Sequence, residues 1–108
     1  MVGSGSLEVF ATPMMVALME RAACEAINDA LGEGQTTVGV YVSVDHLAAT
    51  PLGGQVSAEA TVDSVDGRKI EYTVTASDSA GQIGIGTHTR VIIDVERFMK
   101  KANDRLKA

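Results

Sequence analysis

The stretch ATPMMVALMERAAC, residues 11–24, has the pattern of a helix that other elements cover. Its apolar residues recur at helical spacing, so one broad stripe is available for burial. Thr12 suits the N-cap, and Pro13 suits the first helical position, where no N–H is required. Since Gly32 provides a stop, we expect one long helix over residues 12–31.

One charge interrupts the apolar stripe of this helix. Glu20 is in register with Val16 and Cys24 rather than with the polar face. An ionised carboxylate among apolar groups is costly unless it is paired, hydrogen-bonded or neutralised. The position of Glu20 therefore predicts a partner in the layer that covers the helix.

Downstream of the helix the period of the pattern changes to two, which is typical of strands. Apolar and polar residues alternate in four stretches, and Asp66–Gly67 is a strong hairpin signal between the second and the third. The four stretches lie within residues 36–50, 55–65, 69–77 and 82–95. A long helix followed by antiparallel strands predicts an α+β domain whose curved sheet wraps around the helix.

The first strand carries a histidine on its apolar parity. His46 shares the parity of Val42 and Val44, so it should face the helix while Asp45 points away. Glu20 and His46 are thus directed at one helix–sheet seam by two independent periodicities. A carboxylate facing an imidazole can set its tautomer, and the imidazole can act as general base or acid. The alternative is a structural buried ion pair.

The last strand places its polar residues opposite its apolar set. That set comprises Ile83, Ile85, Val91, Ile93 and Val95. His88 and Arg90 have the other parity, which predicts a histidine on the sheet surface beside Arg90. Arg90 is a candidate cation for a phosphate or a carboxylate.

Two further residues have both a structural and a functional interpretation. Thr12 is explained by capping alone, and it lies roughly 12 Å from Glu20 along the helix axis at 1.5 Å per residue. The two side chains would therefore not touch, although both could line one cleft. Cys24 lies one turn beyond Glu20 and is expected to be a buried structural cysteine.

Composition limits the class of protein. The chain has 108 residues and a mass of 11.3 kDa, so we expect one domain over 1–108, with a flexible start at 1–6 and a helix or tail at 97–108. A net charge of −5 argues against nucleic acid as a partner. With one cysteine, no membrane-length apolar run and no signal peptide, the default location is cytoplasmic. Two histidines and a distant glutamate are too sparse for a metal site.

Longer motifs carry a family resemblance. The stretches VGSGSLEVFATPMMVALMERAA, GQTTVGVYVSVDHLAATPLG and IGIGTHTRVIIDVERF resemble hotdog-fold thioesterases related to fluoroacetyl-CoA thioesterase, over about residues 2–98. The resemblance implies a long central helix wrapped by an antiparallel sheet, pairing as a homodimer or higher oligomer. It also implies a first strand ahead of the helix that we do not expect in this chain, so either the start is truncated or the domain has four strands and an altered sheet edge.

The resemblance also implies a reaction and its residues. Thr12, Glu20 and His46 correspond to the family's catalytic group, Gly39 to a glycine that helps to place the acyl end, and Phe10 to a position near the acyl pocket. The implied activity is hydrolysis of a short- or medium-chain acyl-CoA, with no cofactor because CoA is part of the substrate. His46 would activate water or the acyl group, Glu20 would attack the carbonyl or assist water, and Thr12 would orient one of them.

Two other hypotheses fit the same residues. One is a non-catalytic hotdog protein that binds an acyl-CoA or another small ligand. The other is a truncated structural variant that dimerises without a complete pocket. Release of free thiol from acyl-CoA substrates separates the enzyme from both.

Overall fold

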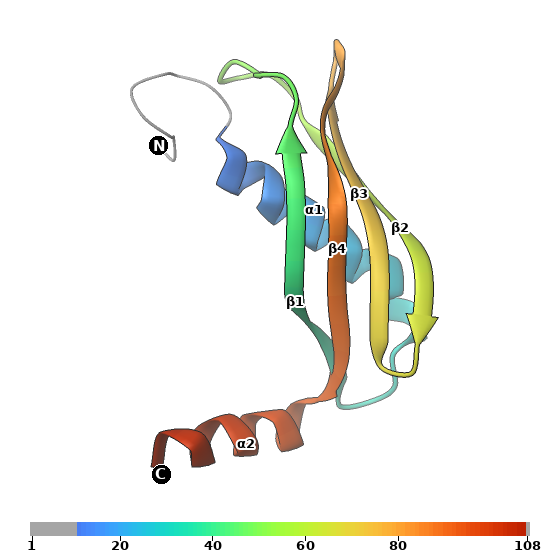
Figure 1. The fold of residues 1–108 in the computed structure, drawn as a ribbon, viewed down its shortest axis with the longest axis vertical. Coiled ribbons are helices and arrows are strands. Elements are labelled where there is room, and N and C mark those ends of the chain that lie inside the picture. The colour runs from blue at the N-terminus through green and yellow to red at the C-terminus, as the bar shows by residue number, and fades with distance from the viewer. Residues whose placement is uncertain (1–10, 108) are drawn as a thin grey trace.

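The structure, a computed structural model, describes residues 11–107 as two helices and one four-stranded antiparallel sheet (Figure 1). The elements in chain order are α1 (Thr12–Ile27), a 3-10 turn η1 (Asn28–Ala30), β1 (Gln35–His46), β2 (Ser57–Asp66), β3 (Lys69–Asp78), β4 (Gly81–Asp94) and α2 (Val95–Lys107). The strand order is β1-β4-β3-β2, and α1 lies across one face of the sheet. The predicted α+β arrangement, a helix covered by an antiparallel sheet, is confirmed.

The helix differs from its prediction at both ends. The α-helical part ends at Ile27 and continues as a 3-10 turn to Ala30, after which Leu31 is extended. At the start, Ala11 is the N-cap residue and Thr12 already lies within the helix, without a capping hydrogen bond from a side chain. The predicted N-cap role of Thr12 is therefore wrong, because its hydroxyl bonds to another element instead.

The core lies between one stripe of α1 and the inner face of β3. Met15, Met19 and Ala23, spaced by four residues, are fully buried. They pack against the alternate residues of β3, namely Ile70, Tyr72, Val74 and Ala76. Glu20 is one position round from this stripe, so it lies at the flank of the buried face rather than in its centre.

A bulge in β1 changes which alternate residues face the helix. Odd-numbered residues face it before the bulge, and even-numbered residues face it afterwards. Gly39 pairs with Arg90 and Tyr41 with Thr89, so Val40 is left out of the ladder. Beyond the bulge His46 is opposite Gly84, and it faces the helix as predicted. Before the bulge the residues that face the helix are Thr37 and Gly39. Of the valines predicted to face the helix, only those after the bulge therefore do so.

The predicted apolar face of β4 is wrong. Ser77 pairs with Gln82 and Ala76 with Gly84, so Ile83 is an extra residue, and it is buried. After this irregularity the inward parity is the one that carries His88 and Arg90, and both side chains are buried. His88 is therefore a histidine of the helix–sheet interior and not of the sheet surface.

The C-terminal helix stands apart from the rest of the chain. α2 leaves the end of β4 and projects past β1 (Figure 1). Its residues are exposed throughout. Across residues 11–107, no helix has both the length and the apolar character needed to cross a membrane.

Candidate active site

The start of α1 and the end of β1 meet through a side-chain contact. Thr12 Oγ1 lies 2.9 Å from His46 Nδ1. The backbone that follows His46 is anchored, because the Leu47 N–H donates to the carbonyl oxygen of Ile83 at 2.7 Å. Thr12 and His46, distant in the sequence, are thus held together by two rigid elements.

The other nitrogen of His46 has no hydrogen-bond partner. Nε2 is buried and unpaired within the part of the chain that is described. With the proton on Nε2, Nδ1 accepts from the Thr12 hydroxyl; with the proton on Nδ1, Nε2 is a free base. Either tautomer leaves one reactive nitrogen position available to a substrate or water.

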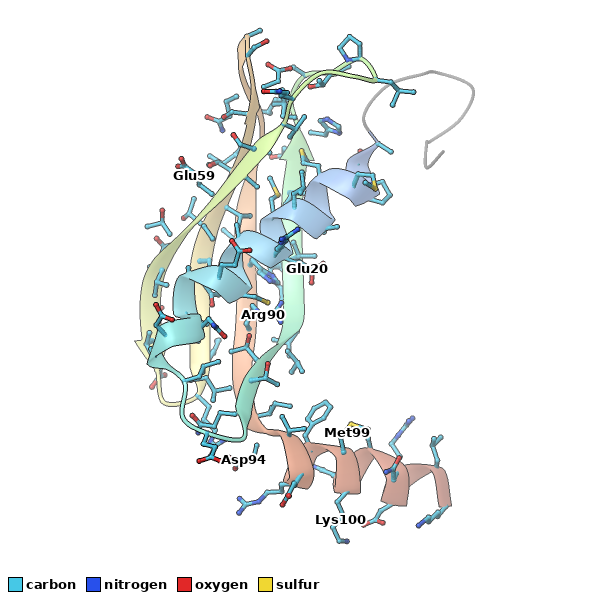
Figure 2. The ribbon with its side chains drawn as sticks, turned by 180° about the vertical axis from the view of Figure 1, so that it is seen from behind. Glu20, Glu59, Arg90, Asp94, Met99 and Lys100 are labelled. Atoms are coloured by element: carbon cyan, nitrogen blue, oxygen red, sulfur yellow. The ribbon has the colours of Figure 1, made fainter. Side chains whose placement is uncertain are left out.

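Further along the seam, Glu20 is paired with an arginine. Glu20 Oε2 lies 3.7 Å from Nη1 of Arg90, and Figure 2 shows the two side chains approaching each other from α1 and β4. Arg90 is fixed from β1, since its Nε donates to Thr37 Oγ1 and its Nη2 to the Thr37 carbonyl oxygen, both at 2.8 Å. The buried guanidinium therefore presents its remaining edge to Glu20.

The expectation that Glu20 is buried is wrong for the single chain. Its side chain is 43% exposed. The reason is its place on the flank of α1 that faces β1, the last strand of the sheet, beyond which no strand of the described chain lies. A carboxylate at this position is open on the side of the β1 edge.

His88 completes the arrangement around Arg90. Its Nδ1 is 2.7 Å from the Tyr41 carbonyl oxygen, which only accepts, so Nδ1 carries the proton and donates. Nε2 is then free to accept from Arg90 Nη1 at 3.4 Å. The ring also stacks on Tyr72, with centroids 5.9 Å apart, and burial raises the pKa of Tyr72 so that the phenol stays protonated. The hydrogen bond at Nδ1 and the stacking on Tyr72 therefore fix the His88 ring beside the guanidinium.

Gly39 lies at the centre of this group. A Cβ atom at position 39 would stand 3.2 Å from Arg90 Nη1, from Glu20 Oε2 and from His88 Cε1. This spacing is tighter than ordinary contacts, so the absence of a side chain keeps the three groups in place. The residue pattern did not indicate that Thr37 or His88 belongs to the site. The inward parity of Gly39 and Arg90 is the signal that could have found both.

The site residues thus form two groups in one chain. Thr12 and His46 make one, and Glu20, Gly39 and Arg90 make the other, whereas Phe10 lies outside the described residues. Within residues 11–107 no hydrogen bond or ion pair joins Glu20 to His46. Seven residues of extended chain separate Gly39 from His46, or roughly 20 Å at about 3.3 Å per residue. The hypothesised direct pair is not formed inside the chain.

No metal site stands out in the same region. Among the residues that the structure describes, no three His, Cys, Asp or Glu side chains are grouped so that they could hold a metal ion.

Known proteins are similar to this chain in sequence and in fold. The model of a family described as "Fluoroacetyl-CoA-specific thioesterase" matches residues 1–96. A fluoroacetyl-CoA thioesterase from Streptantibioticus cattleyicolor is 42% identical over 101 residues, which cover 94% of this chain and 73% of that protein.

Solved structures agree with this match. A mutant of the fluoroacetyl-CoA-specific thioesterase FlK in complex with fluoroacetate and CoA has a TM-score of 0.89 and 40% identity, covering 94% of this chain and 80% of the other. A hot-dog-like protein from Thermanaerovibrio acidaminovorans has a TM-score of 0.85 and 31% identity, covering 91% and 73% of the two chains.

Proposed function

The chain belongs to the family of fluoroacetyl-CoA-specific thioesterases, and from this membership we propose that it hydrolyses a short- or medium-chain acyl-CoA thioester to the free acid and CoA. The observation that carries the proposal is the contact of 2.9 Å between Thr12 Oγ1 and His46 Nδ1. It unites two of the three catalytic residues that the resemblance implies. It also leaves the second imidazole nitrogen without a partner, as a general base or acid requires.

The third catalytic residue, Glu20, would reach this group through a homodimer. Within residues 11–107, β1 is an edge strand with no neighbour on one side, and Val40 and Tyr41 expose large apolar surfaces on it. Such an edge is a template for pairing with a second copy. In an isologous pair the two β1 strands run antiparallel, so the end of one lies beside the beginning of the other.

One register of such a pair would form a shared site. A ladder centred on Ser43, with the bulge residue Val40 left out, sets His46 opposite the partner's Gly39. Residues directly opposite each other share one face of a sheet, and both of these face the helix layer. Because Glu20 lies over Gly39 in each chain, the partner's Glu20 would then stand beside His46. Thr12 and His46 of one copy would work with the partner's Glu20 and Arg90.

These groups allow two routes for hydrolysis of the thioester. In the first, His46 takes a proton from water as the water oxygen attacks the thioester carbonyl; the C–S bond then breaks, and the imidazolium returns the proton to the CoA thiolate. In the second, the Glu20 carboxylate attacks the carbonyl and expels the thiolate, and water cleaves the resulting anhydride. Single turnovers in isotopically labelled water distinguish them. Label in Glu20 identifies the covalent route.

The remaining site residues suit the acyl end of the substrate. Gly39 leaves room next to the Glu20 carboxylate, and Arg90 supplies a fixed cation that can polarise or hold an oxygen. The hydrolysis needs no separate cofactor, since CoA is part of the substrate. We extend the proposal to a cytoplasmic location, in keeping with a single cysteine, Cys24, that is free.

Release of free thiol from a panel of acyl-CoA substrates tests the activity. We expect His46→Ala to lower kcat/KM by about 10²–10⁴, the typical contribution of a general base. Cys24→Ala, which removes a half-buried thiol outside both groups, is the matched control and should retain activity. Equal background rates for the wild type and His46→Ala on every substrate would favour a non-catalytic binding protein.

A mixed dimer tests the shared site. Glu20→Gln and His46→Ala chains, each inactive alone, would combine into heterodimers with one intact site and one doubly altered site. A statistical mixture of two such chains should recover about a quarter of the wild-type activity. No recovery above the single variants, with heterodimers present, would place the whole site within one chain.

A further inference from the structure

The C-terminal helix α2 is amphipathic and carries much of the positive charge of the chain. Its apolar residues fall on a single stripe at helical spacing, namely Val95, Phe98, Met99, Ala102 and Leu106. It holds five of the nine basic residues of the chain and two of the fourteen acidic ones, so its net charge is +3 and that of the remainder is −8. The helix lies almost wholly beyond residues 1–96, which the family model matches.

The described residues, 11–107, leave much of this stripe exposed. Phe98 and Met99 are exposed, and the side chain of Leu106 is 82% exposed. A helix with an apolar stripe of this length gains most of its stability from packing. The exposure therefore indicates that α2 lacks its packing partner in the single chain.

The place where α2 begins fixes what a second copy would present to it. Asp94, just before α2, pairs with Gln35 at the start of β1, and the Val95 N–H donates to the Gly34 carbonyl oxygen at 2.9 Å. From this end of β1 the helix projects past the edge strand (Figure 1). In an antiparallel pair of β1 strands, the start of one β1 lies by the end of the other, so α2 points at the partner's His46 end.

We infer that α2 packs in trans on the second copy of this chain, across the loop 47–54 that follows the partner's His46. This inference rests on the homodimer of the proposed function. Its consequence is that each active site is closed at the His46 end by the C-terminal helix of the other subunit.

The loop 47–54 has the complementary surface. Leu47 and Leu52 are exposed on it, and they match the apolar stripe of α2. The loop is attached to the β3–β4 hairpin, because the buried Thr50 hydroxyl donates to Asp78 Oδ2 at 2.7 Å. Asp78, which holds the loop, and Asp45, one residue before His46, give this end negative charge, opposite the basic flanks of α2.

Cross-linking tests the packing directly. In a Cys24→Ala background, we pair Leu52→Cys with Ala102→Cys, at the centre of the apolar stripe, and treat the protein with a short bismaleimide. The matched control pairs Leu52→Cys with Asp104→Cys on the polar face of α2, and each single-cysteine chain is treated alone. We expect a covalent dimer on a denaturing gel for the Ala102 pair and several-fold less for the Asp104 pair.

A further variant guards against accidental linkage. Leu106→Asp changes a side chain that is almost fully exposed in the single chain, so a free α2 would tolerate it. Packing in trans predicts that Leu106→Asp lowers the cross-link yield several-fold while light scattering still reports a dimer.

The possible outcomes distinguish a failure of α2 packing in trans from a failure of the homodimer. If light scattering reports a dimer but linkage is absent, is confined to single chains, or is equal for the two cysteine pairs, packing of α2 in trans is overturned and the homodimer stands. If light scattering reports a monomer, the homodimer itself fails and the packing of α2 fails with it.

Discussion

β3 and β1 are both long strands with alternating apolar residues, yet they end in opposite environments. The inner side chains of β3, such as Ile70 and Val74, are fully buried against α1, with β2 and β4 on either side. Among the strands of residues 11–107, β1 has only β4 beside it, and its Val40 and Tyr41 are largely exposed. β3 is complete within the described chain, whereas β1 presents an open edge that the proposed homodimer would cover.

Several of the residues suited to chemistry lie on the edge strand β1. β1 supplies His46, Gly39 and the Thr37 groups that hold Arg90. β3 contributes Tyr72, which stacks on His88, but its inner face is otherwise apolar. The inner face of β3 thus mainly stabilises the fold, whereas β1 contributes side chains to the candidate site, and α1 contributes to both.

The largest expected effect comes from breaking the β1 edge. Tyr41→Glu introduces a charge that the Ser43-centred ladder sets opposite the partner's Asp45, and like charges directly opposite destabilise a strand pair. We expect a monomer by light scattering and a loss of kcat/KM of about 10²–10⁴, because each site loses its general base or its carboxylate.

The control lies on the other edge strand. Val65→Glu in β2 alters a side chain that is 57% exposed, the same fraction as Tyr41. We expect a dimer with nearly wild-type activity. If Tyr41→Glu were a folded, fully active monomer, the proposal that the edge of β1 forms the dimer and completes the site would be contradicted.

Truncating a buried side chain of β3 should lower the stability of the fold while leaving the dimer and the activity in place. Ile70→Ala removes a fully buried side chain of β3, and such cavities cost about 2–5 kcal/mol of unfolding free energy. Urea denaturation at fixed protein concentration measures this cost. The folded fraction should still dimerise and hydrolyse thioesters, and Val65→Ala should change the unfolding free energy by less than about 0.5 kcal/mol.

A smaller effect is expected where β1 meets Glu20 and Arg90. Gly39→Ala adds a methyl group 3.2 Å from Glu20 Oε2 and Arg90 Nη1, so one of the two groups must move. Misplacing a group by about 1 Å can reduce catalysis by about 100-fold, so the smaller shift required here should reduce it by up to about 10-fold. We expect that loss in kcat/KM with little change in the urea midpoint. A large fall in the midpoint would instead assign Gly39 a structural role.

The smallest effect concerns the loop that follows His46. Hydrogen bonds from the Thr50 hydroxyl and the Ala80 N–H lower the pKa of Asp78 below its usual 3.8. Because the pKa is depressed on folding, this stabilisation is complete above the unfolded pKa and is lost as the pH falls through the folded pKa. Asp78→Asn should therefore lower Tm slightly at neutral pH. The difference from wild type should shrink as the pH falls below about 3.8. A difference that is independent of pH would contradict this account.

The residue pattern supported the helix, the strands and the candidates Glu20 and His46 for definite reasons, whereas Thr12 became a catalytic candidate only through the family resemblance. Periods of 3.6 and two report directly on which elements form. The parity of His46 held because β1 is regular from Tyr41 to the strand end. The parity of β4 failed because one extra residue, Ile83, changes the face of everything after it. Alternation alone does not reveal such an insertion.

By itself, therefore, the sequence determined the elements of this protein and the kinds of residue at its site, since both depend on local chemistry and spacing. Only the tertiary structure decided the partners. It paired His46 with Thr12 and Glu20 with Arg90, and it placed His88 inside the sheet. The physical reason is that strand order and bulges set which side chains meet, and both arise from the packing of the whole chain.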